Sequence, residues 1–308
     1  MGESSCRAAT DSGETMGRIA VLVNPTAGRG VHGHLLDEVT AILGADAVLL
    51  DARTPEEAEV ACKAAVAEGA RAVVSVGGDG TLHSAVQAVA STGVPLGVVP
   101  AGTGNDIAAC FGLPVDPLDA ARLAAEAAAA GRSAAFDLAR IDGAGQTRWA
   151  AGVIGLGFDT LVNELANRMR FPRGPRRYDI AIVLELARMR PRRYRITVDG
   201  VAEEFDACLV AVGNTARYGG GMRICPAADP TDGLLDLVIA GPISRYTLMR
   251  IKPKVYAGTH VDHPAVRQLR GRTIEVACPG ITSYADGERS LPLPVTITAV
   301  PGALRLLR

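Results

Sequence analysis

The stretch VVSVGGDGTLHSAV, residues 73–86, decides the fold class. Its first four residues suit a strand buried on both faces, and TLHSAV has the composition of a helix. Between them stand three glycines and one aspartate, Asp79. Glycines let a backbone approach a ligand closely, and a helix N-terminus favours anions. The segment therefore predicts a strand, a loop and a helix, with N–H groups and one carboxylate of the loop facing a charged ligand.

The same alternation of strand and helix surrounds this segment. Helical patterns alternate with strand patterns throughout the first 130 or so residues, as in a parallel sheet covered by helices. The helix that follows Thr54 has the clearest signals, because Thr54 suits an N-cap and Pro55 the first helical position. Strand patterns cover 18–24, 47–51, 71–76 and the segment that begins at 95, and helical patterns cover 33–43, 54–69, 81–91 and 116–131.

From Phe136 onward, strand-like runs separated by Asp-Gly turns replace this rhythm, which favours an antiparallel sheet or sandwich. We therefore predict an α/β protein with an N-terminal parallel-sheet nucleotide-binding domain and a mostly antiparallel β-sandwich domain, with the active site in the cleft between them. The expected parts are a disordered leader at 1–16, an α/β domain at 17–133 to which 297–308 returns, and a β-rich domain at 134–296.

Composition narrows the functional classes. The net charge of −1 gives no support for nucleic-acid binding, and 48% hydrophobic residues are typical of a globular protein. No apolar run reaches the roughly 18 residues of a spanning helix, and the start lacks a secretory signal. Six scattered cysteines without a CxxC pair fit reduced thiols, so we expect a cytoplasmic protein. His260 and His263 lack a third ligand residue nearby in the sequence, which disfavours zinc.

One glycine pattern supports a different function. Gly28, Gly30 and Gly33 match G-x-G-x-x-G, and Asp51 follows about 20 residues on, as in dinucleotide-binding proteins. However, the first glycine of that fingerprint should follow its strand at once, and here NPTA intervenes with the rigid Pro25. An NAD-binding oxidoreductase is therefore kept as an alternative.

Three glycine-rich segments fit a phosphate site better than that single match. Each follows a predicted strand, and in a parallel sheet such strand ends share the edge where ligands bind. No Walker loop occurs in the chain. The three segments are NPTAGRG at 24–30, GGDGT at 77–81 and PAGTGND at 100–106.

Together with ADGE at 285–288, these motifs resemble the diacylglycerol kinase catalytic family, which includes bacterial lipid kinases and the sphingosine and ceramide kinases. The resemblance runs from about Arg18 to the C-terminus. It implies an ATP- and Mg²⁺-dependent kinase that acts on a lipid alcohol, with diacylglycerol or a sphingoid-like lipid as acceptor. His83 and Ser84 depart from the Asn-Glu that bacterial members usually carry, although sphingosine kinases can carry histidine at the first position.

The resemblance also implies roles for individual residues. Glu288 would accept the proton of the lipid hydroxyl, Asp286 would assist it, and Asp79 would hold Mg²⁺ through water or directly. Asp79 is the rival for the role of base, but Mg²⁺ lowers the pKa of a bound carboxylate and makes it a poorer base. An extended ADGE segment would direct both carboxylates to one side. The expected ATP-binding residues are Asn24, Pro25, Gly28, Thr54, Gly77, Gly78, Asp79, Gly80, Thr81, Gly102, Thr103 and Asn105.

A second, structural Mg²⁺ site is implied at PAADPTDGLLD, residues 226–236. Matched to bacterial members, its ligands are the side chain of Asp232 and the carbonyls of Asp229 and Leu234. An ordinary Asp-Gly turn explains this segment equally well, and a plain hairpin turn like that at Asp199-Gly200 is the alternative for ADGE. Thr54 is likewise open between a nucleotide contact and a simple helix cap.

The arginine-rich segment at 168–195 predicts a transient contact with a membrane surface, through Arg173, Arg176 and Arg177. A solvated arginine face is the alternative. The sequence leaves open which lipid is phosphorylated, and a homodimer stays compatible with it. A catalytically silent nucleotide or lipid sensor on the same fold is the third functional alternative, which the intact Asp79, Asp286 and Glu288 disfavour.

Overall fold

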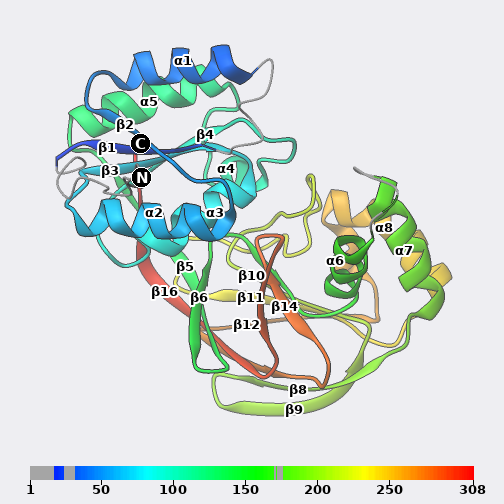
Figure 1. Cartoon of the computed structure of the whole chain (residues 1–308). Coiled ribbons are helices and arrows are strands. Elements are labelled where there is room, and N and C mark those ends of the chain that lie inside the picture. Colours follow the sequence, from blue (N-terminus) through cyan, green and yellow to red (C-terminus); the bar gives the residue numbers. More distant parts are fainter. Residues whose placement is uncertain (1–16, 24–31, 170, 172–175) are drawn as a thin grey trace, which may run out of the picture.

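The computed structural model describes residues 17–23, 32–169, 171 and 176–308. Its first half contains the predicted parallel sheet, in the strand order β2-β1-β3-β4 (Figure 1). The central strand β3, Ala72–Gly77, is buried along its whole length, as the apolar run predicted. Its neighbours are β1 (Ile19–Val23), β2 (Ala47–Leu50) and β4 (Leu96–Pro100), and the pairs β1–β2, β1–β3 and β3–β4 are all parallel.

Helices cover both faces of this sheet because successive strand residues point to opposite sides. Ile19 and Val21 pack towards α1 (His32–Leu43) and α5 (Pro117–Ala129). Ala20 and Leu22 instead pack towards α2 and α3. Figure 1 shows these two helix layers above and below the sheet. The predicted helices are present, as α1, α2 (Pro55–Ala67), α3 (Asp79–Val89) and α5, and a short α4 (Asp106–Cys110) follows the third glycine segment.

The last strand, β16 (Val295–Leu306), joins this sheet to the second half of the chain. Its residue Leu306 pairs in parallel with Leu96 of β4, and β13 and β5 pair with it antiparallel. The first sheet therefore continues beyond the parallel strands as β16-β13-β8-β9, with β5 and β6 attached to β16. These strands are β5 (Ala134–Gly143), β6 (Gln146–Ala150), β8 (Arg192–Val198), β9 (Val201–Ala207) and β13 (Thr273–Ala277). The predicted domain boundaries stay a prediction.

A second, wholly antiparallel sheet has the order β12-β11-β10-β7-β14-β15. Buried residues of both sheets form one apolar cluster, with Ile154, Val210 and Leu237 from the second sheet and Ile196 and Ile274 from the first. The predicted sandwich architecture is confirmed. The strands are β7 (Val153–Gly155), β10 (Leu209–Gly213), β11 (Leu235–Ala240), β12 (Val266–Gly271), β14 (Thr282–Ala285) and β15 (Glu288–Pro292).

The second half also contains helices that the strand-like patterns did not predict. They are α6 (Phe158–Arg168), α7 (Arg176–Arg188), α8 (Arg245–Ala257) and a short 3₁₀ helix, η1 (Thr259–Asp262). Figure 1 shows α6, α7 and α8 together beside the second sheet. His260 lies in η1, where its Nε2 is 3.1 Å from the carbonyl oxygen of Ile224. No group of three or more His, Cys, Asp or Glu residues suited to a metal ion occurs among the described residues.

Candidate active site

Two of the three glycine segments are described, and they pack backbone against backbone at the carboxyl end of the parallel sheet. GGDGT follows β3 and PAGTGND follows β4. A Cβ atom added at Gly102 would lie 2.4 Å from Cα of Gly78, so only glycine fits there. The side chain of Thr81 folds back over Gly77, where an added Cβ would lie 2.3 Å from Thr81 Oγ1. The contact between Gly78 and Gly102 fixes the two loops against each other.

Asn105 holds the third segment in shape. Its backbone is in the left-handed region, with φ at 52°, which asparagine tolerates better than most residues. Its Oδ1 accepts a hydrogen bond from the Gly102 N–H at 3.1 Å, and its Nδ2 donates to the Gly102 carbonyl at 2.9 Å. Gly102, Thr103 and Gly104 are left exposed. An exposed turn with a rigid base can present its backbone N–H groups to an anion.

Asp79 is the first residue of α3 and connects the two segments. Its carboxylate oxygens accept hydrogen bonds from the N–H groups of Asp106 at 3.1 Å and Ile107 at 3.3 Å, at the start of α4. Burial raises the pKa of the Asp79 carboxyl, and the two backbone donors oppose that effect. Asp106 in turn accepts hydrogen bonds from the N–H groups of Gly220 at 2.6 Å and Gly221 at 2.8 Å.

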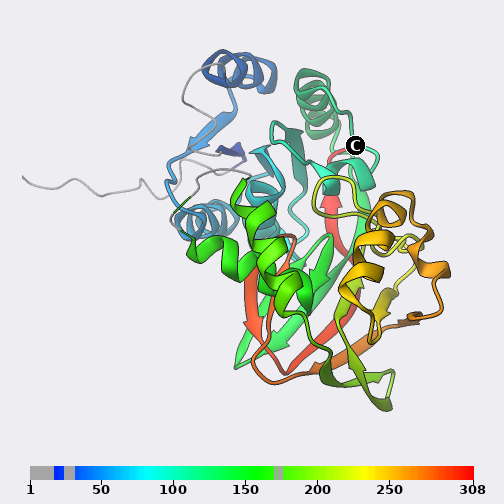
Figure 2. The same ribbon diagram turned by 90° about the vertical axis from the view of Figure 1, so that its right-hand side faces the viewer.

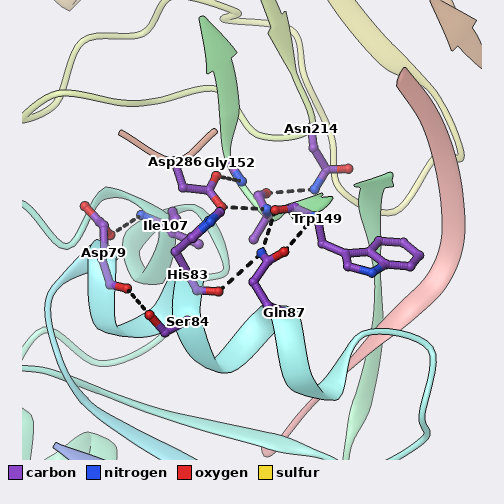
Figure 3. A network of polar contacts seen from close by, with 11 residues as sticks. Asp79, His83, Ser84, Gln87, Ile107, Trp149, Gly152, Asn214 and Asp286 are labelled. Carbon is purple, nitrogen blue, oxygen red and sulfur yellow. Dashed lines mark hydrogen bonds and ion pairs between the residues drawn. The ribbon is translucent and has the colours of Figure 1, made fainter. Parts of the chain in front are cut away.

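Asp286 reaches this region from the far end of the chain (Figure 3). Its side chain is fully buried, and it accepts hydrogen bonds from the N–H groups of Gly152 at 2.7 Å and Ala151 at 3.1 Å. His83 Nδ1, on α3, lies 2.9 Å from Asp286 Oδ2. The other two groups that face Asp286 are donors, so the carboxylate is the acceptor and Nδ1 carries the hydrogen.

His83 is a site residue to which the sequence analysis gave no role. Its departure from the Asn-Glu pattern was the one signal in the sequence, but its partner lies 203 residues away along the chain. One helical turn further on, Gln87 bonds both backbone groups of Trp149, with Nε2 donating to the carbonyl at 2.8 Å and Oε1 accepting from the N–H at 3.0 Å. Helix α3 is thereby fixed to β6 as well as to the turn at Asp286.

Glu288 begins β15 and is exposed. Its Oε1 would lie 2.7 Å from a Cβ atom added at Gly80, so the glutamate rests directly against the GGDGT loop. ADGE forms an Asp-Gly hairpin turn and is not extended, so the condition for both carboxylates to face one side is not met. Asp286 and Gly287 both have positive φ, 55° and 87°, and Ala285 pairs with Glu288 across a two-residue hairpin turn. The turn buries Asp286 and leaves Glu288 exposed, so the two carboxylates do not share one side.

The other residues predicted to bind nucleotide are a helix cap, Thr54, and residues that the structure does not describe. Thr54 is the N-cap of α2, and its hydroxyl accepts a hydrogen bond from the Glu57 N–H at 3.2 Å. Asn24, Pro25 and Gly28 lie outside the described residues, as do Gly30 and the rest of NPTAGRG. Gly33 lies inside α1, and Asp51 follows β2.

At the predicted structural Mg²⁺ site, the carboxylates already have partners. Asp232 Oδ1 accepts a hydrogen bond from the Leu234 N–H at 2.9 Å, and its Oδ2 pairs with the guanidinium of Arg270. Asp229 Oδ1 accepts from the N–H of Thr231 at 3.0 Å. These contacts describe a closed Asp-Gly turn, and the Mg²⁺ ligand set stays a prediction.

The three arginines of the predicted membrane contact have no described side chains. Arg173 lies outside the described residues, and Arg176 and Arg177 begin α7 without described side chains. Among the helices of the described segments, none combines the length and the apolar character that crossing a bilayer requires.

Two family models match the chain, one for each half. The diacylglycerol kinase catalytic domain matches residues 18–141, and the YegS C-terminal NAD kinase beta sandwich-like domain matches residues 152–308. The first match ends within β5, and the second begins directly before β7.

Curated proteins and solved structures agree with these models. A diacylglycerol kinase of Mycobacterium tuberculosis H37Rv is 44% identical over 95% of this chain and 96% of its own length. A probable YegS-like lipid kinase of Xanthomonas oryzae is 33% identical, over 88% of this chain and 90% of its own. The crystal structure of a putative diacylglycerol kinase from Bacillus anthracis superposes with a TM-score of 0.76 at 22% identity, over 98% of both chains.

Proposed function

Because the chain belongs to the diacylglycerol kinase family with a YegS-like C-terminal domain, and is a diacylglycerol kinase-like lipid kinase, we propose that it transfers the γ-phosphoryl group of ATP to the hydroxyl of diacylglycerol. Phosphatidic acid is then the product. One observation carries the proposal most directly, namely the contact of the Glu288 carboxylate with Gly80 of the GGDGT loop. The family also rules out the dinucleotide-dependent oxidoreductase as the reading of Gly28, Gly30 and Gly33.

The glycine loops are proposed to bind the phosphates of ATP. The backbones of Gly78 and Gly102 touch, which leaves no room for side chains that would shield the N–H groups of the loops. Helix α3 begins at Asp79, so the positive end of its dipole faces the same region. Thr103, exposed beside them, is proposed to contact phosphate or ribose.

Asp79 fits the role of a Mg²⁺ ligand. Sites for phosphoryl transfer hold Mg²⁺ with one or two carboxylates, together with phosphate oxygens and water. Each Asp79 oxygen accepts one backbone N–H, and a carboxylate oxygen can take a further partner. Asp286 fits less well, because three donors already face it. Asp106 also fits less well, because its two backbone hydrogen bonds, at 2.6 and 2.8 Å, are shorter than those of Asp79, at 3.1 and 3.3 Å. When bound, Mg²⁺ supplies positive charge that offsets the charge developing on the transferred group.

Glu288 is proposed as the general base. It takes the proton of the lipid hydroxyl while that oxygen forms its bond to the γ-phosphorus and the bond from phosphorus to the ADP oxygen breaks. Asp286 is a poorer candidate, since its donors stabilise its charged, proton-free form and weaken it as a base. Asp79 is a poorer candidate because a bound Mg²⁺ would lower the pKa of its carboxyl, which burial alone raises. Asp286 instead positions the turn that carries Glu288.

The test is transfer of labelled phosphate from ATP to lipid alcohols in mixed micelles, with diacylglycerol and a sphingoid base offered separately. We expect diacylglycerol to be labelled and Glu288→Gln to lower kcat by about 10²–10⁴-fold, the usual contribution of a positioned base. Glu275→Gln is the matched control, because Glu275 is an exposed strand glutamate on β13.

Three results would count against the proposal. Labelling of the sphingoid base alone would change the acceptor, and a Glu288→Gln variant as fast as wild type would remove the assigned base. ATP binding without transfer to any lipid would favour the silent sensor.

A further inference from the structure

Helix α8 presents an apolar face to solvent. Its Val255 packs against the buried cluster of the second sheet, and on the same side of the helix Ile251 is buried and Leu248 is partly buried. On the opposite side, exposed fractions are 72% for Tyr246, 61% for Met249 and 47% for Tyr256. These residues occupy positions i, i+3 and i+10 of the helix, which share one face at 3.6 residues per turn. The outward face of α8 is therefore an apolar stripe.

Basic side chains border this stripe on both sides. Arg250 and Lys254 are four residues apart and lie along one border, and Arg245 and Lys252 lie along the other. All four are exposed, and the sequence of α8, RYTLMRIKPKVYA, contains no acidic residue. The guanidinium of Arg245 lies over the ring of Tyr246, 5.9 Å from its centroid. An apolar stripe between basic borders is the composition of helices that lie in the surface of an anionic bilayer.

Helix α7 also exposes an apolar stripe, although its sequence, RRYDIAIVLELAR, contains two acidic residues. Ile180, Val183 and Leu184, at i, i+3 and i+4, are 40%, 64% and 39% exposed. A helix of a soluble protein normally buries such a stripe, but α7 packs on α6 through Ala181, on its other side. The exposed, basic Arg188 lies one turn beyond Leu184, at the end of the helix. Phe171, 80% exposed, precedes the helix.

Both helices lie on one side of the molecule. Figure 1 places α6, α7 and α8 together at the side of the sandwich. Figure 2 looks directly at that side and shows α6 and α7 in front on one half and α8 on the other. Other exposed apolar residues, such as Val60 on α2, Val115 before α5 and Val201 on β9, are scattered singly over other elements. The outward faces of α7 and α8 together are called the α7–α8 face below.

We propose that the α7–α8 face rests on an anionic lipid bilayer and inserts its apolar side chains among the headgroups. This rests on the proposed function in one respect, since the acceptor lipid is drawn from that bilayer. A second copy of the chain is a poorer occupant, because a two-fold interface would bring the unbalanced basic charges of α8 together.

The test is co-sedimentation of the full chain with sucrose-loaded vesicles of phosphatidylglycerol and phosphatidylcholine, or of phosphatidylcholine alone. Two paired variants remove the stripes, Tyr246→Ser with Met249→Ser and Val183→Ser with Leu184→Ser. A third, Arg250→Gln with Lys254→Gln, removes charge. The control pair, Val60→Ser with Val115→Ser, removes apolar side chains of 67% and 81% exposure from other faces.

We expect each stripe variant to partition at least about tenfold more weakly than wild type, and the control pair to be unchanged. The charge variant should bind the vesicles that contain phosphatidylglycerol more weakly than wild type does, and it should bind the phosphatidylcholine vesicles as wild type does. Phosphorylation of a short-chain, monomeric diacylglycerol should be unaffected in all variants, which shows that the fold and site are intact.

Wild-type vesicle binding by both stripe variants overturns the proposal. It is equally overturned if light scattering shows a wild-type dimer that the stripe variants dissociate, because the face is then an interface between copies. Loss of vesicle binding in a protein that phosphorylates no lipid would support the docking face and contradict the proposed kinase reaction, so the two failures are distinguishable.

Discussion

Asp286 is held by three donors that belong to two distant segments, the N–H groups of Ala151 and Gly152 and the Nδ1–H of His83. The sequence predicted the carboxylate from its motif. It could not predict the donors, because they meet Asp286 only when α3, β6 and the β14–β15 turn come together. A carboxylate buried with these donors fixes the turn, and the turn sets the place of Glu288 against Gly80.

Replacing His83 by alanine should therefore weaken both the fold and the chemistry. We expect His83→Ala to lower the free energy of unfolding by about 1–3 kcal/mol, since a buried carboxylate loses a donor. The kcat should fall while KM for ATP changes little. His83→Asn restores an N–H donor of similar reach and should recover most of both losses. Urea unfolding and initial rates check this, and equal behaviour of the alanine and asparagine variants would contradict the positioning role.

Asp159, near the start of α6, is a buried carboxyl of a different kind. Its Oδ1 is buried without a hydrogen-bond partner. Burial raises its pKa to about 6, although backbone N–H groups of Thr160 and Gly157 favour the charged form. The folded protein thus binds this proton more tightly than the unfolded chain does. Its contribution to stability is complete at low pH and is lost as the pH rises from about 4 to about 6.

Removing the charge at Asp159 should remove this dependence on pH. The free energy of unfolding of wild type, relative to Asp159→Asn, should be lower at pH 7.5 than at pH 4.5 by about 2 kcal/mol. Urea unfolding of both proteins across this range measures the difference. Parallel curves for the two proteins would show that Asp159 titrates as an ordinary, solvated carboxyl.

The helices of the first half show which helix starts can be predicted from the local sequence. The cap-and-proline pairs predicted the starts of α2 at Pro55 and α5 at Pro117, because capping is encoded within four adjacent residues. Helices α7 and α8 were missed for the opposite reason. Their apolar residues are divided between a buried side and an exposed side, so the sequence lacks the contrast that marks a surface helix.

The two roles considered for Thr54 predict different phenotypes. As the cap of α2, its hydroxyl bonds the Glu57 N–H, so Thr54→Ala should lower the free energy of unfolding by about 1 kcal/mol. KM for ATP should not change, and Thr54→Ser should behave as wild type. Thermal unfolding and ATP titration of initial rates separate the roles. A raised KM for ATP in the alanine variant would instead support the nucleotide contact.

Over the whole molecule, β16 ties the two halves into one structure. Val295 and Ile297 belong to the core between the two sheets, whereas Leu304 and Leu306 belong to the core beneath α2 and α3. The sequence predicted a return of the C-terminus to the first domain. A single strand that runs through both cores is a long-range arrangement, which no local pattern encodes.

A shared strand predicts cooperative unfolding. Leu306 is fully buried, so Leu306→Ala should lower the free energy of unfolding by about 2–5 kcal/mol. Both halves should lose this stability together, because disorder of β16 opens both cores. The single tryptophan, Trp149, packs against the first core and reports that region by fluorescence, while far-UV circular dichroism reports the whole chain. We expect the two urea transitions to coincide in wild type and to shift by the same amount in Leu306→Ala. Separate transitions, with only the tryptophan signal moved, would show that the halves unfold independently and that β16 does not couple them.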